Sequence, residues 1–230
     1  VLYWFFVSGF DKPLVVAGLI VVSIISFIDD VSRVSYRVRL AVHVAVVTLL
    51  FWQADLFGEF WYIWATAYIF TIGWINAFNF MDGINGISGG YSLVSLLTFL
   101  YLNRQRPFTS EELLIVMLIA VVVFLFFNAR KKAVVFAGDV GSISLAFILA
   151  WFIIKLIVVY SKLFNILLFS VYAIDSVITI VYRIKRRENI LKPHRTHLYQ
   201  YLANEMGWPH LKVTAIYAMT QLVVNIIGIY

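Results

Sequence analysis

Residues 136–160 read FAGDVGSISLAFILAWFIIKLIVVY, a polar turn that runs into an apolar segment whose only charged residue is Lys155. A helix needs about 20 predominantly apolar residues to cross a bilayer. Residues 142–160 come close to that length, and the Gly-Asp-Val-Gly sequence places polar groups at the end where the segment enters the membrane. The stretch therefore predicts a transmembrane helix with a polar, glycine-containing N-terminal end.

Seven further apolar segments accompany this one along the chain. The eight predicted spans are residues 13–28, 38–54, 59–76, 87–102, 112–128, 142–160, 164–181 and 211–230. Backbone groups in hydrocarbon must satisfy their own hydrogen bonds, so each span should be a helix. We expect an all-α fold, a polytopic transmembrane bundle of about eight spans that forms one domain over residues 1–230. Residues 1–10 resemble the end of a further span, and the chain begins with Val, so we expect the native protein to start earlier.

The composition of the 230 residues agrees with a membrane protein. Hydrophobic residues make up 63% and charged residues 13%, whereas about a quarter of a soluble domain is charged. A soluble globular enzyme and a disordered chain are therefore excluded. The absence of Cys excludes thiol catalysis and Cys-ligated zinc. The formal net charge of +6 suits anionic lipid, a phosphorylated substrate or nucleic acid; we expect the membrane and a substrate as partners, with no nucleic acid.

The distribution of Lys and Arg predicts the orientation. Counting spans places residues 29–37, 77–86, 129–141 and 182–210 on one side of the membrane. With Arg39 and Lys212 at the adjoining span ends, that side carries thirteen Lys and Arg, against four on the other. Because cytoplasmic loops are enriched in Lys and Arg, we expect these four loops to face the cytoplasm.

Four polar clusters fall in or beside those loops. They are Asp29-Asp30, the segment Asn76 to Gly86 (with Asn79, Asp82 and Asn85), the segment Phe136 to Ser142 (with Asp139), and the segment Pro193 to Gln200 (with His194, Arg195 and His197). Successive clusters are separated by 52, 57 and 55 residues, measured from Asp30 to Asp82, Asp139 and His194. Two spans with their loops take about that length, so each interval should return the chain to the same membrane face.

The carboxylates of these clusters suggest a hard cation. Asp29, Asp30, Asp82 and Asp139 offer the oxygen ligands that suit Mg²⁺ or Mn²⁺, which commonly bind one or two carboxylates together with substrate phosphates. Two alternatives remain open. Asp29-Asp30 would also fit a solvated helix end, and Asp82 and Asp139 lie in Asp-Gly and Gly-Asp pairs, which favour turns.

The glycine and histidine residues also allow two interpretations each. Glycines that open the spans 87–102 and 142–160 let backbone N–H groups approach a phosphate at a helix N-terminus, or they allow close helix packing. His194 and His197 with Arg195 could donate to a phosphate, whereas a zinc site lacks a third ligand in register. Asp175 lies inside a span and is a candidate functional residue for that reason; the alternative is an ion pair with Arg183 or Arg187.

Taken together, the clusters resemble the motifs of the polyprenyl-phosphate N-acetylhexosamine-1-phosphate transferases, glycosyl transferase family 4. That family's paired Asp and following basic residue look like Asp29-Asp30 with Arg33, and its N-x-x-N-x-x-D-G-x-D-G segment looks like Asn76 to Gly86. Its F-x-G-D-x-G-S segment looks like Phe136 to Ser142, preceded by Asn128. Its H-R-x-H-L-Y-Q segment looks like His194 to Gln200, with Asp175 and Arg183 upstream. The similarity covers about residues 20–203 and is closer to the O-antigen and lipopolysaccharide initiators than to the peptidoglycan enzyme. Asn85 departs from the pattern, since many members have Asp there.

The resemblance implies an Mg²⁺-dependent transfer of N-acetylhexosamine-1-phosphate from a UDP-sugar to polyprenyl (undecaprenyl) phosphate. UMP would be released at the cytoplasmic face of the bacterial plasma membrane, and the product would initiate a cell-envelope glycan. The implied catalytic residues are Asp29, Asp30, Asp82, Asp139, His194 and His197. The implied substrate contacts are Arg33, Asn76, Asn79, Asn85, Asn128, Arg195 and Asp175. The implied metal ligands are Asp139 and Asp82. The oligomeric state is open, a homodimer included. The rival interpretations are a secondary transporter, which would place its acids near the membrane midplane, and a non-catalytic membrane protein.

Overall fold

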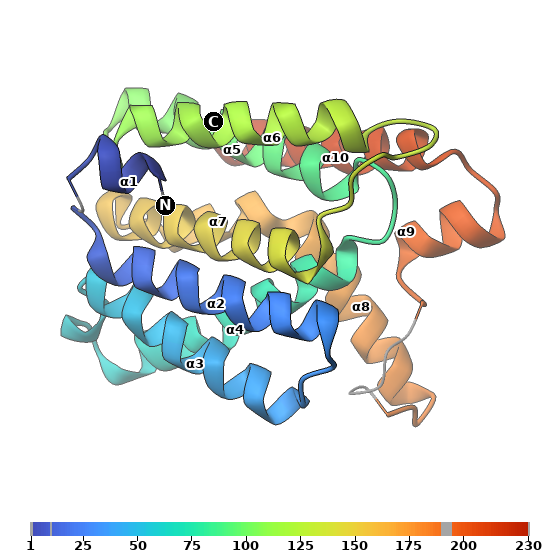
Figure 1. The fold of residues 1–230 in the computed structure, drawn as a ribbon, viewed down its shortest axis with the longest axis horizontal. Coiled ribbons are helices and arrows are strands. Elements are labelled where there is room, and N and C mark those ends of the chain that lie inside the picture. The colour runs from blue at the N-terminus through green and yellow to red at the C-terminus, as the bar shows by residue number, and fades with distance from the viewer. Residues whose placement is uncertain (1, 10, 190–194, 230) are drawn as a thin grey trace.

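The computed structural model describes residues 2–9, 11–189 and 195–229, and it contains helices and no strands in those ranges. The predicted all-α class is therefore confirmed. The elements are α1 (Leu2–Phe6), α2 (Pro13–Val31), α3 (Tyr36–Gln53), η1 (Leu56–Gly58), α4 (Trp61–Met81), α5 (Ile87–Gln105), α6 (Glu111–Asn128), α7 (Gly138–Tyr160), η2 (Leu163–Phe169), α8 (Ser170–Lys185), α9 (Leu198–Gln200), η3 (Tyr201–Glu205) and α10 (His210–Ile229) (Figure 1).

The long helices correspond to the eight predicted spans. Five segments of the described chain are long and apolar enough to cross a membrane: α2, α6, α7, the continuous stretch of η2 and α8, and α10. The helices α3, α4 and α5 carry more polar residues, such as Arg37 and Arg39 on α3 and Asn76 and Asn79 on α4. A polytopic membrane bundle is thus confirmed, while eight remains the predicted number of spans.

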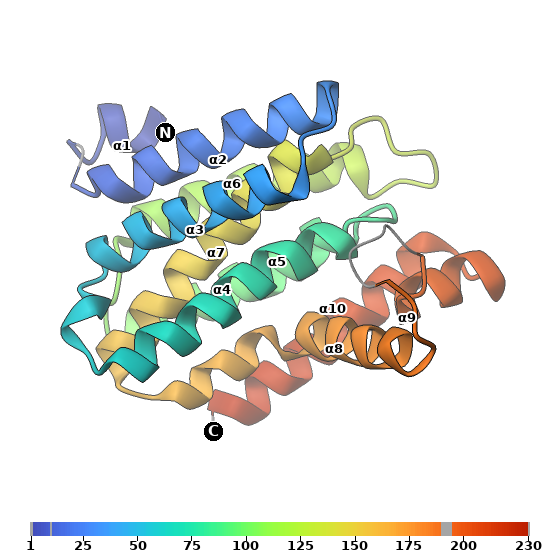
Figure 2. The same ribbon diagram turned by 90° about the horizontal axis from the view of Figure 1, so that it is seen from below.

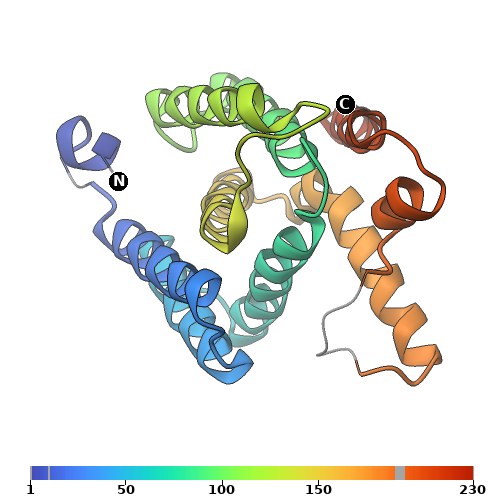
Figure 3. The ribbon, with the colours of Figure 1, turned by 45° about the vertical axis from the view of Figure 1, so that its right-hand side comes forward.

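Helix α7 lies at the centre of the bundle. Figure 3 shows it surrounded by α2, α4, α5 and α6. Ala146, Phe147, Leu149 and Phe152 on α7 are fully buried. The indole N–H of Trp74 on α4 donates to the Ala146 carbonyl at 3.0 Å. Because α7 is packed on several sides, the position of its N-terminal end is set by its neighbours.

Helix α8 joins the bundle through aromatic stacking near its N-terminal end. Phe169 stacks on Trp74 with ring centroids 3.8 Å apart, and Tyr172 stacks on Tyr91 at the same separation. Farther along, α8 leans away from the other helices (Figure 3). Asp175 connects α8 to α9 and α10, because its carboxylate accepts from the Leu198 N–H and the Tyr217 hydroxyl.

The loops that carry the polar clusters meet at one end of the bundle. The α2–α3 turn, the α4–α5 loop, the α6–α7 loop and the described parts of the α8–α9 connection all lie at the right-hand end in Figure 1, and Figure 2 gives the same result from below. The prediction that the clusters return to the same end of the bundle is therefore confirmed for the described residues. That this end faces the cytoplasm stays a prediction.

Candidate active site

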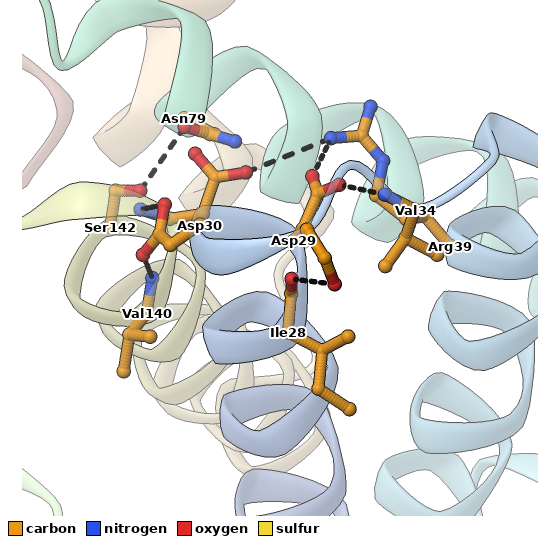
Figure 4. A network of polar contacts seen from close by, with 10 residues as sticks. Ile28, Asp29, Asp30, Val34, Arg39, Asn79, Val140 and Ser142 are labelled. Atoms are coloured by element: carbon orange, nitrogen blue, oxygen red, sulfur yellow. Dashed lines mark hydrogen bonds and ion pairs between the residues drawn. The ribbon is translucent and has the colours of Figure 1, made fainter.

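The N-terminus of α7 is capped by a carboxylate from the end of α2. Asp30 accepts hydrogen bonds from the backbone N–H groups of Asp139 at 3.1 Å and Val140 at 3.4 Å (Figure 4). Gly138 has a φ of +60°, and a Cβ at this position would lie 2.9 Å from Asp30 Oδ2. Both the conformation and the close approach require glycine. The N–H groups that the sequence offered to a phosphate are therefore bound to Asp30.

Asp29, the neighbouring acid, is bound to the start of the next helix. Its carboxylate accepts a hydrogen bond from the Val34 backbone N–H at 2.6 Å and forms an ion pair with Arg39 at 2.5 Å. The same guanidinium lies 3.7 Å from the Asp139 carboxylate. One arginine thus lies between acids from α2 and α7. The predicted convergence of Asp29, Asp30 and Asp139 is confirmed by this geometry.

Arg39 was not among the site residues predicted from the sequence. The predicted residue Arg33 is exposed and makes no hydrogen bond or ion pair within the described ranges. Arg39 lies in the first two turns of α3, where Ser35 caps the helix and accepts from Val38 N–H. The sequence indicated this role only by the position of Arg39, which is the third Arg after Asp29-Asp30. Its position depends on the tight α2–α3 turn, which folds α3 back along α2.

Of the two asparagines on α4, only Asn79 reaches this acidic cluster. Its Oδ1 accepts a hydrogen bond from the Ser142 hydroxyl at 3.2 Å (Figure 4), and its amide contacts the Asp139 carboxylate. The Asn76 amide donates to the Ile72 carbonyl of its own helix at 2.8 Å. Asn79 therefore lies against α7, while the substrate contact expected of Asn76 is untested.

Asp82 directly follows α4, at the start of the α4–α5 loop, and lies near Tyr199. The Tyr199 phenol is fully buried and donates to the Phe80 carbonyl at 2.8 Å. A Cβ at Gly83 would overlap the phenol oxygen, so this glycine serves close packing. Burial raises the pKa of the Asp82 carboxyl above its usual range, and the Ser88 side chain acts in the opposite direction. Burial, with the nearby charges of Asp82 and Asp175, also raises the pKa of Tyr199.

Within the described ranges no hydrogen bond or ion pair joins Asp82 to Asp139. No group of three His, Asp or Glu side chains there is arranged to hold a metal by itself. The carboxylates of Asp29 and Asp30 both accept from backbone N–H groups, whereas the contacts of the Asp139 carboxylate in the described part of the chain are with side chains. The donor set thus fits a hard cation that binds Asp139 and completes its shell with phosphate and water. The pairing of Asp82 with Asp139 on a metal remains a prediction.

The side chains of Asn85 and Asn128 form hydrogen bonds with the backbone of the site loops. The Asn85 amide donates to the Arg130 carbonyl at 2.7 Å and approaches the Lys131 carbonyl at 3.4 Å. Asn128 accepts from the Gly86 N–H at 2.6 Å and donates to the Val135 carbonyl at 2.7 Å. Together they join the α4–α5 loop to the α6–α7 loop. An amide is needed at residue 85 because aspartate could not donate to two carbonyl groups. The substrate contacts predicted for both residues are untested.

His197 is buried in a polar cluster with Asp175. Asp175 Oδ1 lies 3.2 Å from His197 Nδ1 and accepts from the Leu198 N–H at 3.1 Å. His197 and Asp175 are only 2% and 7% exposed. The alternative partner Arg183 instead contacts Glu188 and the Asn189 carbonyl. Asp175 therefore fixes the start of α9, and a catalytic role for His197 remains a prediction.

Two remaining predicted residues belong to the segment before α9. Arg195 is exposed and lines a cleft between α8 and α10. His194 lies outside the described residues.

The comparison with protein families covers the part of the chain that holds Asp29, Asp30, Asp82 and Asp139. Residues 13–157, more than half of the chain, match the family model for glycosyl transferase family 4. The chain belongs to glycosyl transferase family 4. All four acids lie in the matched range, Asp29 and Asp30 at the end of α2, Asp82 directly after α4 and Asp139 at the start of α7.

Curated relatives cover most of the chain at low identity. A probable undecaprenyl-phosphate N-acetylglucosaminyl 1-phosphate transferase of Bacillus subtilis is 25% identical over 93% of this chain and 62% of the relative. A phospho-N-acetylmuramoyl-pentapeptide-transferase of Thermotoga maritima is 24% identical over 95% of this chain and 76% of the relative. One of the same name from Dictyoglomus turgidum is 33% identical over 67% of this chain and 49% of the relative.

The chain therefore spans less than two thirds of the first of these relatives. Relatives with two different sugar substrates in their names match at nearly equal identity. The similarity consequently does not choose between the two kinds of glycosyl transferase family 4 enzyme.

Proposed function

We propose that the protein transfers an N-acetylhexosamine-1-phosphate from a UDP-sugar to polyprenyl phosphate. An oxygen of the lipid phosphate attacks the β-phosphorus of the UDP-sugar, the bond from that phosphorus to the bridging oxygen breaks, and UMP leaves. The convergence of Asp29, Asp30, Asp139 and Arg39 at one end of a membrane bundle carries this proposal. The names of the family 4 relatives support a reaction of this class.

Charge is the central requirement of the proposed reaction. Both substrates are anions, and a phosphate monoester is largely dianionic at neutral pH because its second pKa is near 6. A strong base is not needed, so we assign Asp29 and Asp30 to positioning. Asp30 holds the N-terminus of α7, and Asp29 holds Arg39. Arg39 is placed to donate to a phosphate when it turns from Asp139, since guanidinium groups bind phosphate oxygens well.

The proposed cofactor is Mg²⁺, with Mn²⁺ as an alternative, held by Asp139 and assisted by the Asn79 oxygen. When bound, the ion would neutralise the diphosphate oxygens and the leaving UMP. Asp82 would hold the nucleotide or the ion from the α4–α5 loop. Asn79 receives a hydrogen bond from Ser142, which fixes the direction of its carbonyl.

The cleft between α8 and α10 suits the prenyl chain. It has a volume of about 740 Å³ and is lined mainly by apolar side chains, among them Ile174, Ile178 and Val224. Arg186 and Arg195 lie at its loop end together with one acid, Glu205. An apolar cleft with two cations at one end matches a long hydrocarbon chain with a phosphate head group. Arg33, exposed on the α2–α3 turn, is a further candidate for the lipid phosphate.

The test is UMP release from the protein in detergent. Undecaprenyl phosphate and a panel of UDP-N-acetyl sugars would be supplied with Mg²⁺ or with EDTA. UMP that depends on both lipid and metal, with one sugar, is the expected result and would also name the sugar. The absence of UMP with every sugar, from protein shown to be folded, would contradict the proposal. Uptake of a labelled solute by proteoliposomes without UMP release would favour a transporter.

A further inference from the structure

One face of α10 carries a stripe of polar side chains. The stripe consists of His210, Thr214, Tyr217, Gln221 and Asn225, whose spacing of three or four residues places them on one side of a helix. The last four are each at most 9% exposed. Polar groups at membrane depth are costly and usually functional or paired. The partners of the stripe therefore indicate its role.

The C-terminal half of the stripe fixes α10 to its neighbouring helices. Gln221 Oε1 accepts hydrogen bonds from the Val171 N–H and the Tyr91 hydroxyl, both at 3.0 Å. The Gln221 amide donates to Asn225, and the Asn225 amide donates to Thr98 on α5 at 2.9 Å. Val171 lies where η2 becomes α8. These bonds set the depth of α10 relative to α5 and α8.

The N-terminal half of the stripe ends on the loops of the site. The Thr214 hydroxyl donates to the Asn85 carbonyl at 2.9 Å. The Tyr217 hydroxyl donates to Asp175 Oδ2 at 2.6 Å, and the other oxygen of Asp175 accepts from the Leu198 N–H. Thr214 and Tyr217 are three residues apart, so less than one helical turn joins the two contacts.

We infer that Thr214 and Tyr217 are positioning residues, which hold the α4–α5 loop and the start of α9 in a fixed relation across the site. The Thr214 bond ends on the loop that follows Asp82. The Tyr217 bond ends on Asp175 of α8, whose other carboxylate oxygen accepts from the Leu198 N–H at the start of α9. The effect on catalysis rests on the proposed function, whereas the effect on the two loops does not.

Tyr217→Phe is the main test, because it removes one hydroxyl and keeps the ring. We expect the substituted protein to fold, with hydrogen exchange in peptides covering residues 195–205 several times faster than in the wild type. We also expect kcat for UMP release to fall by about tenfold or more, with a small change in the KM for the UDP-sugar, because small misplacement of reacting groups is expensive.

Tyr160→Phe is the matched control. The Tyr160 hydroxyl donates to the Leu102 carbonyl at 2.6 Å, at the opposite end of the bundle from the site. The same atom is removed from a bond of the same length. This control should lower the unfolding temperature without changing kcat or the exchange of residues 195–205.

Thr214→Val gives a second test that does not depend on the stability of the Tyr217 variant. It should increase exchange in residues 82–90 and leave residues 195–205 nearly unchanged. Equal behaviour of Tyr217→Phe and Tyr160→Phe in both exchange and kcat would overturn the inference. Faster local exchange in a protein whose wild type releases no UMP would keep the positioning role and contradict the proposed function instead.

Discussion

The carboxylate of Asp30 accepts a hydrogen bond from the backbone N–H of Asp139 at 3.1 Å, although 109 residues separate the two acids. The acceptor is in the last turn of α2 and the donor is in the first turn of α7. A negative side chain at this point also interacts favourably with the helix dipole. One acid of the cluster therefore determines where another acid is presented.

Gly138→Ala should disturb this relationship directly. The added Cβ would lie 2.9 Å from Asp30 Oδ2 on a backbone with φ of +60°. We expect the substitution to destabilise the protein by more than about 1 kcal/mol and to lower UMP release strongly. Thermal unfolding and turnover would be measured together. Gly73→Ala is the control, since a Cβ at Gly73 meets nothing within 4 Å; equal behaviour of the two variants would contradict the role of Gly138.

Asp139→Asn should nearly abolish turnover while the protein still folds. The side chain contacts Arg39 and Asn79, and the capping bonds to Asp30 come from the backbone, which the substitution preserves. A loss of about a hundredfold or more in kcat is expected when one charged group at a phosphoryl-transfer site is removed. UMP release would be followed over a range of Mg²⁺ concentrations. Near-normal activity at saturating Mg²⁺ would remove Asp139 from the site.

Arg39→Ala should lower activity by about a hundredfold, because it removes a cation from a site that binds two anions. Arg39→Lys should retain part of the charge and lose the planar donor geometry. Arg37→Ala is the matched control, since Arg37 is exposed and contacts only Tyr36 among the described residues. If Arg37→Ala and Arg39→Ala had equal effects, general positive charge rather than the position of Arg39 would be responsible.

Asn85→Asp separates two roles for this position. In the structure the amide donates to the Arg130 carbonyl at 2.7 Å and approaches that of Lys131. A carboxylate would face those oxygens without a hydrogen to donate, at a cost of about 1–3 kcal/mol. We expect a lower unfolding temperature and lower activity. Increased activity with a lower requirement for Mg²⁺ would show instead that an acid at residue 85 serves the metal.

Asp82→Asn should stabilise the substrate-free protein at neutral pH. Burial raises the pKa of Asp82 in the folded state above the ordinary value of 3.8. The unfolded chain then loses this proton at lower pH than the folded chain, so the contribution of Asp82 to stability falls as the pH rises above 3.8. The gain from Asn should be clear at pH 7 and shrink as the pH approaches 4. A pH-independent difference in unfolding temperature would argue against this cause. UMP release should fall, because Asp82 is proposed to hold the nucleotide or the ion.

Sequence alone located the acids and predicted which of them share an end of the bundle. Apolar length defined the segments, and the spacing of Asp30, Asp82 and Asp139 implied that each returns to the same end. Both results depend on local composition and on counting, which require no knowledge of packing. The membrane class followed for the same reason, since the cost of leaving backbone groups unbonded in hydrocarbon allows few alternatives.

Only the tertiary structure decided which polar atoms bind one another. Because of the tight α2–α3 turn, Arg39 and not Arg33 pairs with Asp29. Asn85 and Asn128 donate to loop carbonyl groups, and Asp175 accepts from Tyr217 of α10. These contacts join segments far apart in the chain, and each requires an orientation defined within a few tenths of an ångström. Helical periodicity specifies a face of a helix and says little about the neighbouring element. The sequence therefore determined the fold class and the set of candidate residues, and the packing of helices determined which of them form the site.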